Sequence, residues 1–108
     1  MHSARVFCYK ENIMTIEELQ EWVKKDWAKS NVQPELIDQL LFAIEEFGEV
    51  AEAIRKKITK NDYKQDDDKL GSEFGDLFIS LTTLANSFDV NITKELHSFQ
   101  KKIAARRT

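Results

Sequence analysis

The chain has 108 residues, 42% hydrophobic and 32% charged, which is the length and composition of one globular domain and excludes disorder throughout. The formal net charge of -3 and an isoelectric point near 5.4 argue against a nucleic-acid partner, because general nucleic-acid binders are normally basic. The longest strongly apolar run, residues 40–44, is too short to cross a bilayer, so no membrane partner is expected.

Residues 1–13 show no helical period and lack the apolar core of a signal peptide. They contain Cys8, the single cysteine, so we expect a reducing compartment and place the protein in the cytoplasm. A capping box follows, in which Thr15 can cap a helix and Glu18 can reach back. We therefore predict a loose N-terminal arm over 1–13 and a helical domain over 14–108. An ordered extension that packs on a partner is the open alternative for the arm.

The spacing of apolar residues predicts four helices. The chain has three glycines and one proline, so few residues would interrupt long helices. The predicted helices cover about 15–29, 34–58, 67–88 and 92–105. Pro34 opens the second, because proline suits a first helical position. No segment alternates as a strand would, so the predicted fold class is all-α.

The second predicted helix carries "IEEFGEV" at residues 44–50, with Glu45, Glu46 and Glu49 close together. At about 100° per residue, Glu45 points to solvent, whereas Glu46 and Glu49 lie on a flank of the core face. The residues expected on that core face are Ala43, Ile44, Phe47, Val50, Ala51 and Ile54.

The third predicted helix adds Glu73 and Asp76, which lie three residues apart at the border of its apolar stripe. If the two helices pack antiparallel, this pair converges with Glu46 and Glu49. Four carboxylates without a His or Cys ligand suit Mg²⁺, with Mn²⁺ as a substitute. One acidic pair alone is usually a solvated face. Two pairs on the inward flanks of consecutive helices favour a metal site.

Two segments, "LFAIEEFGEVAEAIRK" at 41–56 and "SEFGDLFISLTTLANSFDVNI" at 72–92, resemble the MazG-like branch of the all-α nucleotide pyrophosphohydrolase superfamily. The resemblance implies Mg²⁺-dependent hydrolysis of a nucleoside triphosphate to a monophosphate and pyrophosphate, with removal of unwanted nucleotides as the role. It also implies a four-helix MazG-like fold whose bundle is completed by oligomerisation, as a homodimer or homotetramer. A non-catalytic nucleotide-binding or adaptor module is the alternative function.

By position, the resemblance implies that Glu46, Glu49, Glu73 and Asp76 hold the metal. It gives the catalytic role to Glu46 and to Glu45, the first glutamate of the motif, which would orient water or a second ion.

Four further residues are candidates for binding the nucleotide. Trp27, near a helix end, can stack on a base, although a tryptophan at helical spacing is more often core. Asn86, off the apolar stripe, can make a polar contact. Lys57 and Lys101 either contact phosphates or stabilise their helices, because a cation near a helix C-terminus interacts favourably with the helix dipole. The C-terminal "FQKKIAARRT" lacks the asparagine of the Lys-x-x-Asn-x-x-Arg tail found in small relatives.

Overall fold

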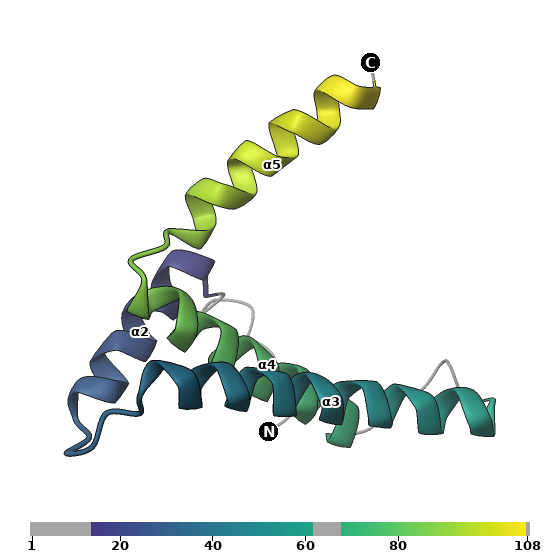
Figure 1. The fold of residues 1–108 in the computed structure, drawn as a ribbon. Coiled ribbons are helices and arrows are strands. Elements are labelled where there is room, and N and C mark those ends of the chain that lie inside the picture. The colour runs from purple at the N-terminus through teal and green to yellow at the C-terminus, as the bar shows by residue number, and fades with distance from the viewer. Residues whose placement is uncertain (1–13, 62–67, 108) are drawn as a thin grey trace, which may run out of the picture.

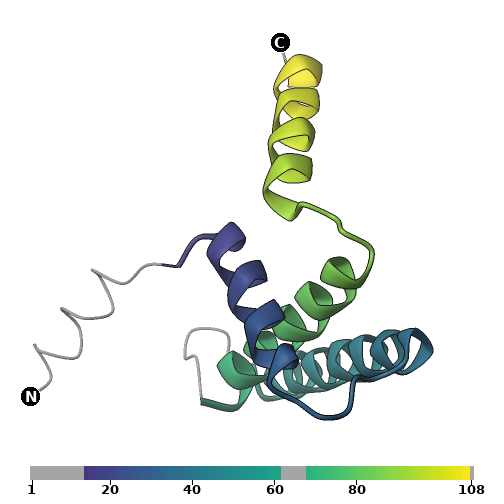
Figure 2. The ribbon, with the colours of Figure 1, turned by 90° about the vertical axis from the view of Figure 1, so that its left-hand side faces the viewer.

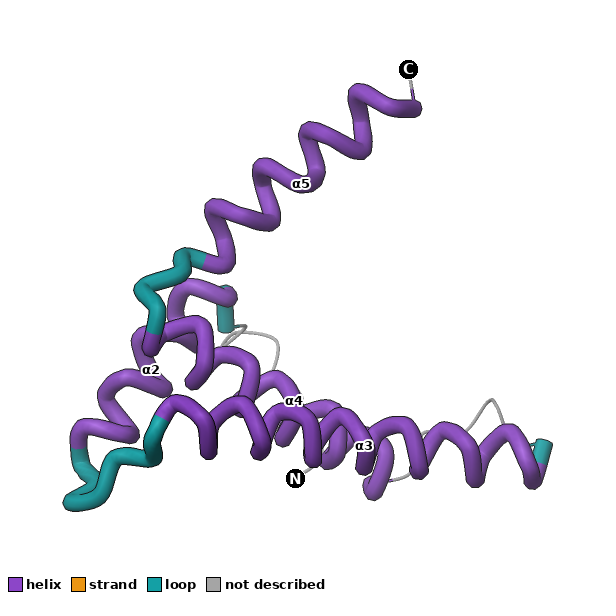
Figure 3. The backbone as a smooth tube through the Cα atoms, in the orientation of Figure 1, coloured by secondary structure: helices purple, strands orange, loops and turns teal. Residues whose placement is uncertain are grey.

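The structure, a computed structural model, describes residues 14–61 and 68–107, so the predicted arm at 1–13 lies outside the described residues. The described residues form four helices, α2 (Ile16–Ala28), α3 (Leu36–Lys60), α4 (Asp68–Ser87) and α5 (Ile92–Arg107). Figure 3 shows short loops between α2 and α3 and between α4 and α5, and no strand occurs within the described ranges. The prediction of an all-α fold is confirmed.

The helix ends follow local chemistry. At the start of α2, the Thr15 N–H donates to Glu18 Oε1 at 2.9 Å and the Glu18 N–H donates to Thr15 Oγ1 at 3.0 Å, which is the predicted capping box. The prediction that α3 opens at Pro34 was wrong by two residues, because Glu35 is the N-cap and keeps an extended backbone. Asn61 ends α3 in the left-handed conformation, which asparagine tolerates better than most residues.

Helices α3 and α4 run antiparallel and form the largest helix–helix interface (Figure 1). Their register follows from two contacts: Gln39 near the start of α3 meets Ser87 at the end of α4, and the middle of α3 meets Glu73. Helix α2 packs on α4, and α5 contacts α2 while it rises away from the α3–α4 pair (Figures 1 and 2).

The interface between α3 and α4 uses small side chains on α3. Ala43, Val50 and Ala53 are buried there, together with the amide of Gln39. The predicted core face of α3 was therefore only partly right, because Ile44 and Phe47 are 58% and 63% exposed. The physical reason is that α3 has two apolar faces, and the small-residue face is the one that lets the helices approach closely. Glu46 lies in this interface, between Ala43 and Val50.

The large apolar side chains of α3 lie about 100° around the helix from the interface with α4. The exposed apolar side chains of α4 also lie about 100° around their helix from the interface. Because the two helices are antiparallel, these side chains and those of α3 face the same side of the pair. Glu49 and Asp76 lie on the opposite side. We call this surface the apolar face; its members are Ile37, Leu40, Ile44, Phe47, Ile54, Ile58, Phe74, Phe78 and Leu81. None of the described helices is long and apolar enough to cross a membrane.

Candidate functional site

Three carboxylates meet at the interface between α3 and α4. Glu46 and Glu49 from α3 and Glu73 from α4 each place a carboxylate oxygen within 4.8 Å of the other two. Glu46 and Glu49 are one turn apart on α3, and the antiparallel packing sets Glu73 opposite them. The structure thus brings together three of the four predicted metal ligands, which we call the acidic cluster.

The acidic cluster is short of compensating partners. Glu46 and Glu73 are half-buried, and within the described residues the Oε2 atom of each is buried without a hydrogen-bond partner. The pKa of the Glu73 carboxyl is raised, first by its hydrogen bond with Glu49, then by burial and the Glu49 charge, with a smaller effect of Asp76, while Lys69 acts in the opposite direction. Like charges next to orphaned, buried oxygens form an arrangement that a bound cation would relieve. The donor set, oxygen only, fits a hard divalent ion.

The two remaining acidic candidates lie beside the acidic cluster. Asp76 is exposed, three residues beyond Glu73 on α4, and its charge contributes to the raised pKa of Glu73. It does not belong to the group of three that converges. Glu45 is exposed on α3 and also lies outside that group.

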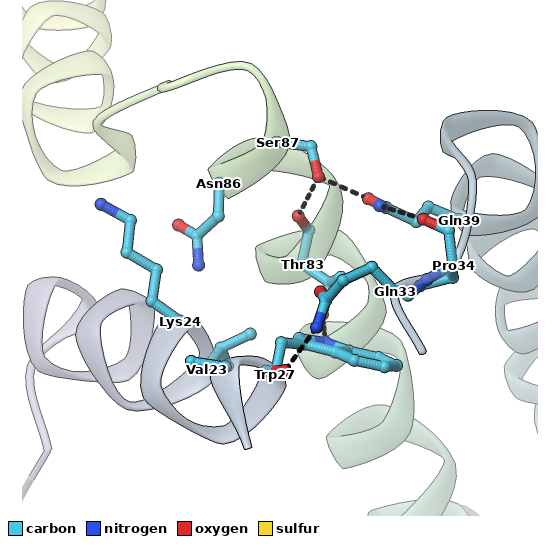
Figure 4. Close-up of a pocket in the computed structure, with 10 residues that line it drawn as sticks. Val23, Lys24, Trp27, Gln33, Pro34, Gln39, Thr83, Asn86 and Ser87 are labelled. Carbon is cyan, nitrogen blue, oxygen red and sulfur yellow. Dashed lines mark hydrogen bonds between the residues drawn. The ribbon is translucent and has the colours of Figure 1, made fainter. Parts of the chain in front are cut away.

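A cavity of about 270 Å³ lies between α2, the start of α3 and the end of α4 (Figure 4). Its walls combine an indole ring and aliphatic groups with amides and hydroxyls, and the residues that line it are Val23, Lys24, Trp27, Ala28, Gln33, Pro34, Gln39, Thr83, Asn86 and Ser87. Ligand sites commonly pair an apolar lining with a few placed polar groups, so this cavity has the character of a small-molecule site.

Two predicted substrate-binding residues, Trp27 and Asn86, line this cavity. The indole of Trp27 is half-buried, and its Nε1–H donates to Thr83 Oγ1 at 3.1 Å, which fixes the plane of the ring. The amide of Asn86 donates through Nδ2 to the Gln20 carbonyl at 2.9 Å and accepts from Gln20 Nε2 at 2.9 Å. Both side chains are therefore held in place by contacts between α2 and α4.

A sequence model of the MazG nucleotide pyrophosphohydrolase domain matches residues 34–108. The chain belongs to this family. A comparison with curated proteins and one with solved structures each give no match.

The MazG match covers α3, α4 and α5, and therefore all five acidic candidates. It begins after α2, so Trp27 lies before the matched segment, whereas Gln39, Asn86 and Ser87 lie within it. The cavity is thus built by helices inside the MazG match and by the helix that precedes it.

The structure does not place the two lysine candidates at the cavity. Lys57 is half-buried in the last turn of α3 and is absent from the cavity lining. Lys101 is exposed on α5, which points away from the α3–α4 pair (Figure 1). Within one chain, neither lysine belongs to the acidic cluster or to the cavity lining.

Sequence reasoning missed five polar residues of the cavity, namely Lys24, Gln33, Gln39, Thr83 and Ser87. Ser87 Oγ donates to Gln39 Oε1 at 2.7 Å, and Thr83 holds the Trp27 indole. One signal was present: Gln39 stands four residues before Ala43 and seven before Glu46, so it shares their helix face and interrupts an otherwise small apolar row. The contacts with Ser87 and Pro34 had no sequence signal.

Proposed function

We propose that the chain hydrolyses (deoxy)nucleoside triphosphates between the α and β phosphorus atoms, giving a monophosphate and pyrophosphate, as a house-cleaning enzyme of the nucleotide pool. One observation carries the proposal: in a MazG-family chain, Glu46, Glu49 and Glu73 converge within 4.8 Å and two of their oxygens are buried without a partner. Such a set would be stabilised by a cation, and it lies on the same pair of helices as the cavity lined by Trp27 and Gln39.

We assign Mg²⁺ to the acidic cluster, with Mn²⁺ as a substitute, because hard cations prefer carboxylate oxygens. Glu46, Glu49 and Glu73 would hold the ion, and the exposed Asp76 would join them by a rotation of its side chain. Bound there, the ion would neutralise phosphate charge and lower the pKa of a bound water.

The catalytic work of the chain itself falls to Glu45 and Glu46. Glu46 has one buried oxygen in the acidic cluster, which leaves its other oxygen to accept a hydrogen bond from the attacking water. Glu45 is exposed on the neighbouring position of α3, where it can orient that water or a second ion from the solvent side.

The cavity is the proposed site for the base. Trp27 would stack on the base, and Asn86 would contact its polar edge. Gln39 and Glu46 are seven residues apart on the same face of α3, so the acidic cluster lies about 10 Å along the helix from the cavity. A smaller hollow lined by Trp27, Phe42 and Ile79 continues from the cavity toward the middle of α3 and α4, and we call the two hollows together the groove. A nucleotide can therefore lie with its base at Trp27 and its phosphates at the carboxylates.

We propose further that two copies of the chain pair through the apolar face, as a homodimer or as half of a homotetramer. Monomeric proteins rarely expose a contiguous apolar surface of this kind. Two antiparallel α3–α4 pairs, stacked face to face, make a four-helix bundle. Because α5 points away from its own acidic cluster, we assign phosphate contact by Lys101 to the site of the second copy. Lys57, in the last turn of α3, would contact phosphates beyond the acidic cluster.

The experiment that tests the function combines pyrophosphate release with thermal unfolding. We expect the wild-type chain to release pyrophosphate from at least one (d)NTP with Mg²⁺, and Mg²⁺ alone to raise its melting temperature by mass action. Glu49→Gln should lose turnover and the Mg²⁺-dependent rise while keeping its helical signal, because it removes one ligand of the acidic cluster.

Glu52→Gln is the matched control, since Glu52 is exposed on the same helix and pairs with Arg55 at 2.6 Å outside the acidic cluster. It should behave as wild type in both measurements. A wild-type chain that releases no pyrophosphate from any natural or oxidised (d)NTP would refute the enzymatic proposal. A Glu49→Gln variant with full turnover would refute the ligand assignment alone.

A further inference from the structure

Gln39 is the most buried amide of the described residues, with 8% of its surface exposed. It lies on the α3 side of the interface with α4, in a row whose other buried members are Ala43, Val50 and Ala53. An apolar side chain of similar size would suit that interface, because a buried amide is costly unless its groups are hydrogen-bonded.

The orientation of the Gln39 amide is fixed. Its Nε2 donates to the Pro34 carbonyl at 3.2 Å, and its Oε1 accepts from Ser87 Oγ at 2.7 Å (Figure 4). Turning the amide over would set Oε1 against the Pro34 carbonyl, where two acceptors repel. The side chain is thus held with a known donor side and a known acceptor side.

Half of the hydrogen-bonding capacity of Gln39 is left over. A glutamine amide has two N–H donors and two acceptor lone pairs, and the two bonds above use one of each. Gln39 lines the cavity beside Trp27, and it also lines the smaller hollow that continues along the groove. A ligand in the cavity can therefore meet one N–H and one lone pair of an amide that cannot turn to suit it.

We propose that Gln39 is a specificity-determining residue, which reads the hydrogen-bonding edge of the base that stacks on Trp27. This inference rests on the proposed function and adds to it how the base is chosen. A fixed donor beside a fixed acceptor distinguishes bases that differ by exchanging an amino group for an oxo group, such as cytosine and uracil. Discrimination is strongest when the wrong base leaves a buried polar group unpaired, and Gln39 is placed for that.

Two substitutions test the hydrogen-bonding groups of Gln39 separately from its volume. Gln39→Glu keeps the shape but replaces the amide NH₂ by an acceptor oxygen, so it should change which base is preferred. It should also lower the melting temperature, because the new oxygen faces the Pro34 carbonyl. Gln39→Met keeps the volume and removes both groups, so it should make the enzyme indifferent between the two bases. Thr82→Val is the matched control, because Thr82 is the other buried polar side chain of the described residues, at 2% exposed. Its hydroxyl donates to Phe78 within its own helix and lines neither hollow.

The experiment measures kcat/KM for dCTP, for dUTP and for the base-free deoxyribose 5-triphosphate in all four proteins, with melting temperatures as a check of folding. We expect Gln39→Glu and Gln39→Met to change the dCTP:dUTP ratio by at least about tenfold, the size of a lost or mispaired buried hydrogen bond. The rate on the base-free triphosphate should stay near the wild-type value, because the amide does not touch the phosphates. Thr82→Val should keep the wild-type ratio.

The outcomes separate the inference from the function on which it rests. If the wild type hydrolyses these substrates and the ratio stays the same in Gln39→Met, the reading of the base by Gln39 is refuted while the function stands. A loss of rate on the base-free triphosphate equal to the loss on dCTP and dUTP also refutes it, because the amide would then be structural. If the wild type hydrolyses no triphosphate, the proposed function fails and the inference fails with it.

Discussion

Single residues in the interface between α3 and α4 are polar where packing alone would favour apolar groups. Glu46 and Glu73 each keep a buried oxygen without a partner among the described residues, and Gln39 is a buried amide two turns from Glu46. The buried amide and the buried carboxylates differ in the partners available to their polar atoms. Gln39 has hydrogen-bond partners within the chain, whereas the acidic cluster has a surplus of negative charge that a bound cation would offset.

The raised pKa of Glu73 predicts how stability without metal depends on pH. The folded chain holds the Glu73 proton more tightly than the unfolded chain, in which the carboxyl has its ordinary pKa of 4.5. The contribution of Glu73 to stability is therefore greatest below that value, and it is lost as the pH rises through the raised folded pKa. Urea unfolding of wild type and Glu73→Gln, from about pH 4 to about pH 7, should show a decline in wild type that the variant lacks.

Glu52→Gln provides a control of opposite sign. The hydrogen bond with Arg55 lowers the pKa of Glu52, so its contribution to stability is present above its ordinary pKa and is lost as the pH falls. If Mg²⁺ binds the ionised acidic cluster as proposed, adding it should reverse the decline seen in wild type at the upper end of the range. If the free energy of unfolding depends on pH in the same way in wild type and Glu73→Gln, the raised pKa of Glu73 is contradicted.

Among the helices, α3 differs from the others in having two apolar faces with different surroundings. Its small-residue face meets α4 and contains Glu46, and its large-residue face is exposed. Helix α2 contributes in another way, since Gln20 and Trp27 both bond to α4 and so fix one wall of the cavity. Gln20 also accepts from the Ile92 N–H at 3.0 Å, which ties the start of α5 to α2.

The capping box at the start of α2 predicts a measurable loss of stability. Thr15→Ala removes the hydroxyl that accepts from the Glu18 N–H, so the free energy of unfolding should fall by about 1 kcal/mol. Chemical unfolding followed by far-UV circular dichroism measures this change. Thr59→Ala is the comparison, because the Thr59 hydroxyl donates only to Arg55 within the last turns of α3, and the effect should stay within about 0.5 kcal/mol. Equal losses in the two variants would show that the capping box does not stabilise α2.

At the scale of the whole molecule, the helices form an open structure rather than a closed bundle. Helix α4 lies between α3 and α2, and α5 extends outward (Figure 1). The side chains of the apolar face are exposed within the described part of the chain. The buried hydrophobic core of the described chain consists of Val23, Ala43, Val50 and Ala53, which is small for a domain of this length. A second copy would supply the missing layer.

The dimer proposal predicts that a charge on the apolar face separates the copies. Ile44→Asp and Phe78→Asp, at side chains 58% and 52% exposed, should shift the protein to a monomer with a lower melting temperature, since each would bury a carboxylate in the joint bundle. Light scattering after gel filtration measures the mass. Val32→Asp, in a loop at 73% exposed, should leave the mass unchanged. A monomeric wild type at micromolar concentration would exclude the dimer.

Much of the fold could be predicted from local patterns. The capping box at Thr15, the four helical periods and the spacing of Glu46 and Glu49 on one helix all depend on residues within a few positions of one another. The approach of Glu73 to that pair depends on the antiparallel packing of α3 and α4. The choice between the two faces of α3 could not be predicted in this way. Ile44 and Phe47 are more hydrophobic than Ala43 and Ala53, yet the smaller side chains pack within the chain because they let α4 approach.

The sequence by itself therefore determined the helices and the two acidic pairs, because helix period and capping are properties of near neighbours. Only the tertiary structure decided that Gln39 meets Ser87, that Trp27 is held by Thr83 and that Gln20 holds Asn86. These contacts join residues 48, 56 and 66 positions apart, and no local pattern encodes such a pairing. Each acidic pair follows from spacing along its own helix, whereas the approach of Glu73 to Glu46 and Glu49 and the formation of the cavity depend on how the helices pack.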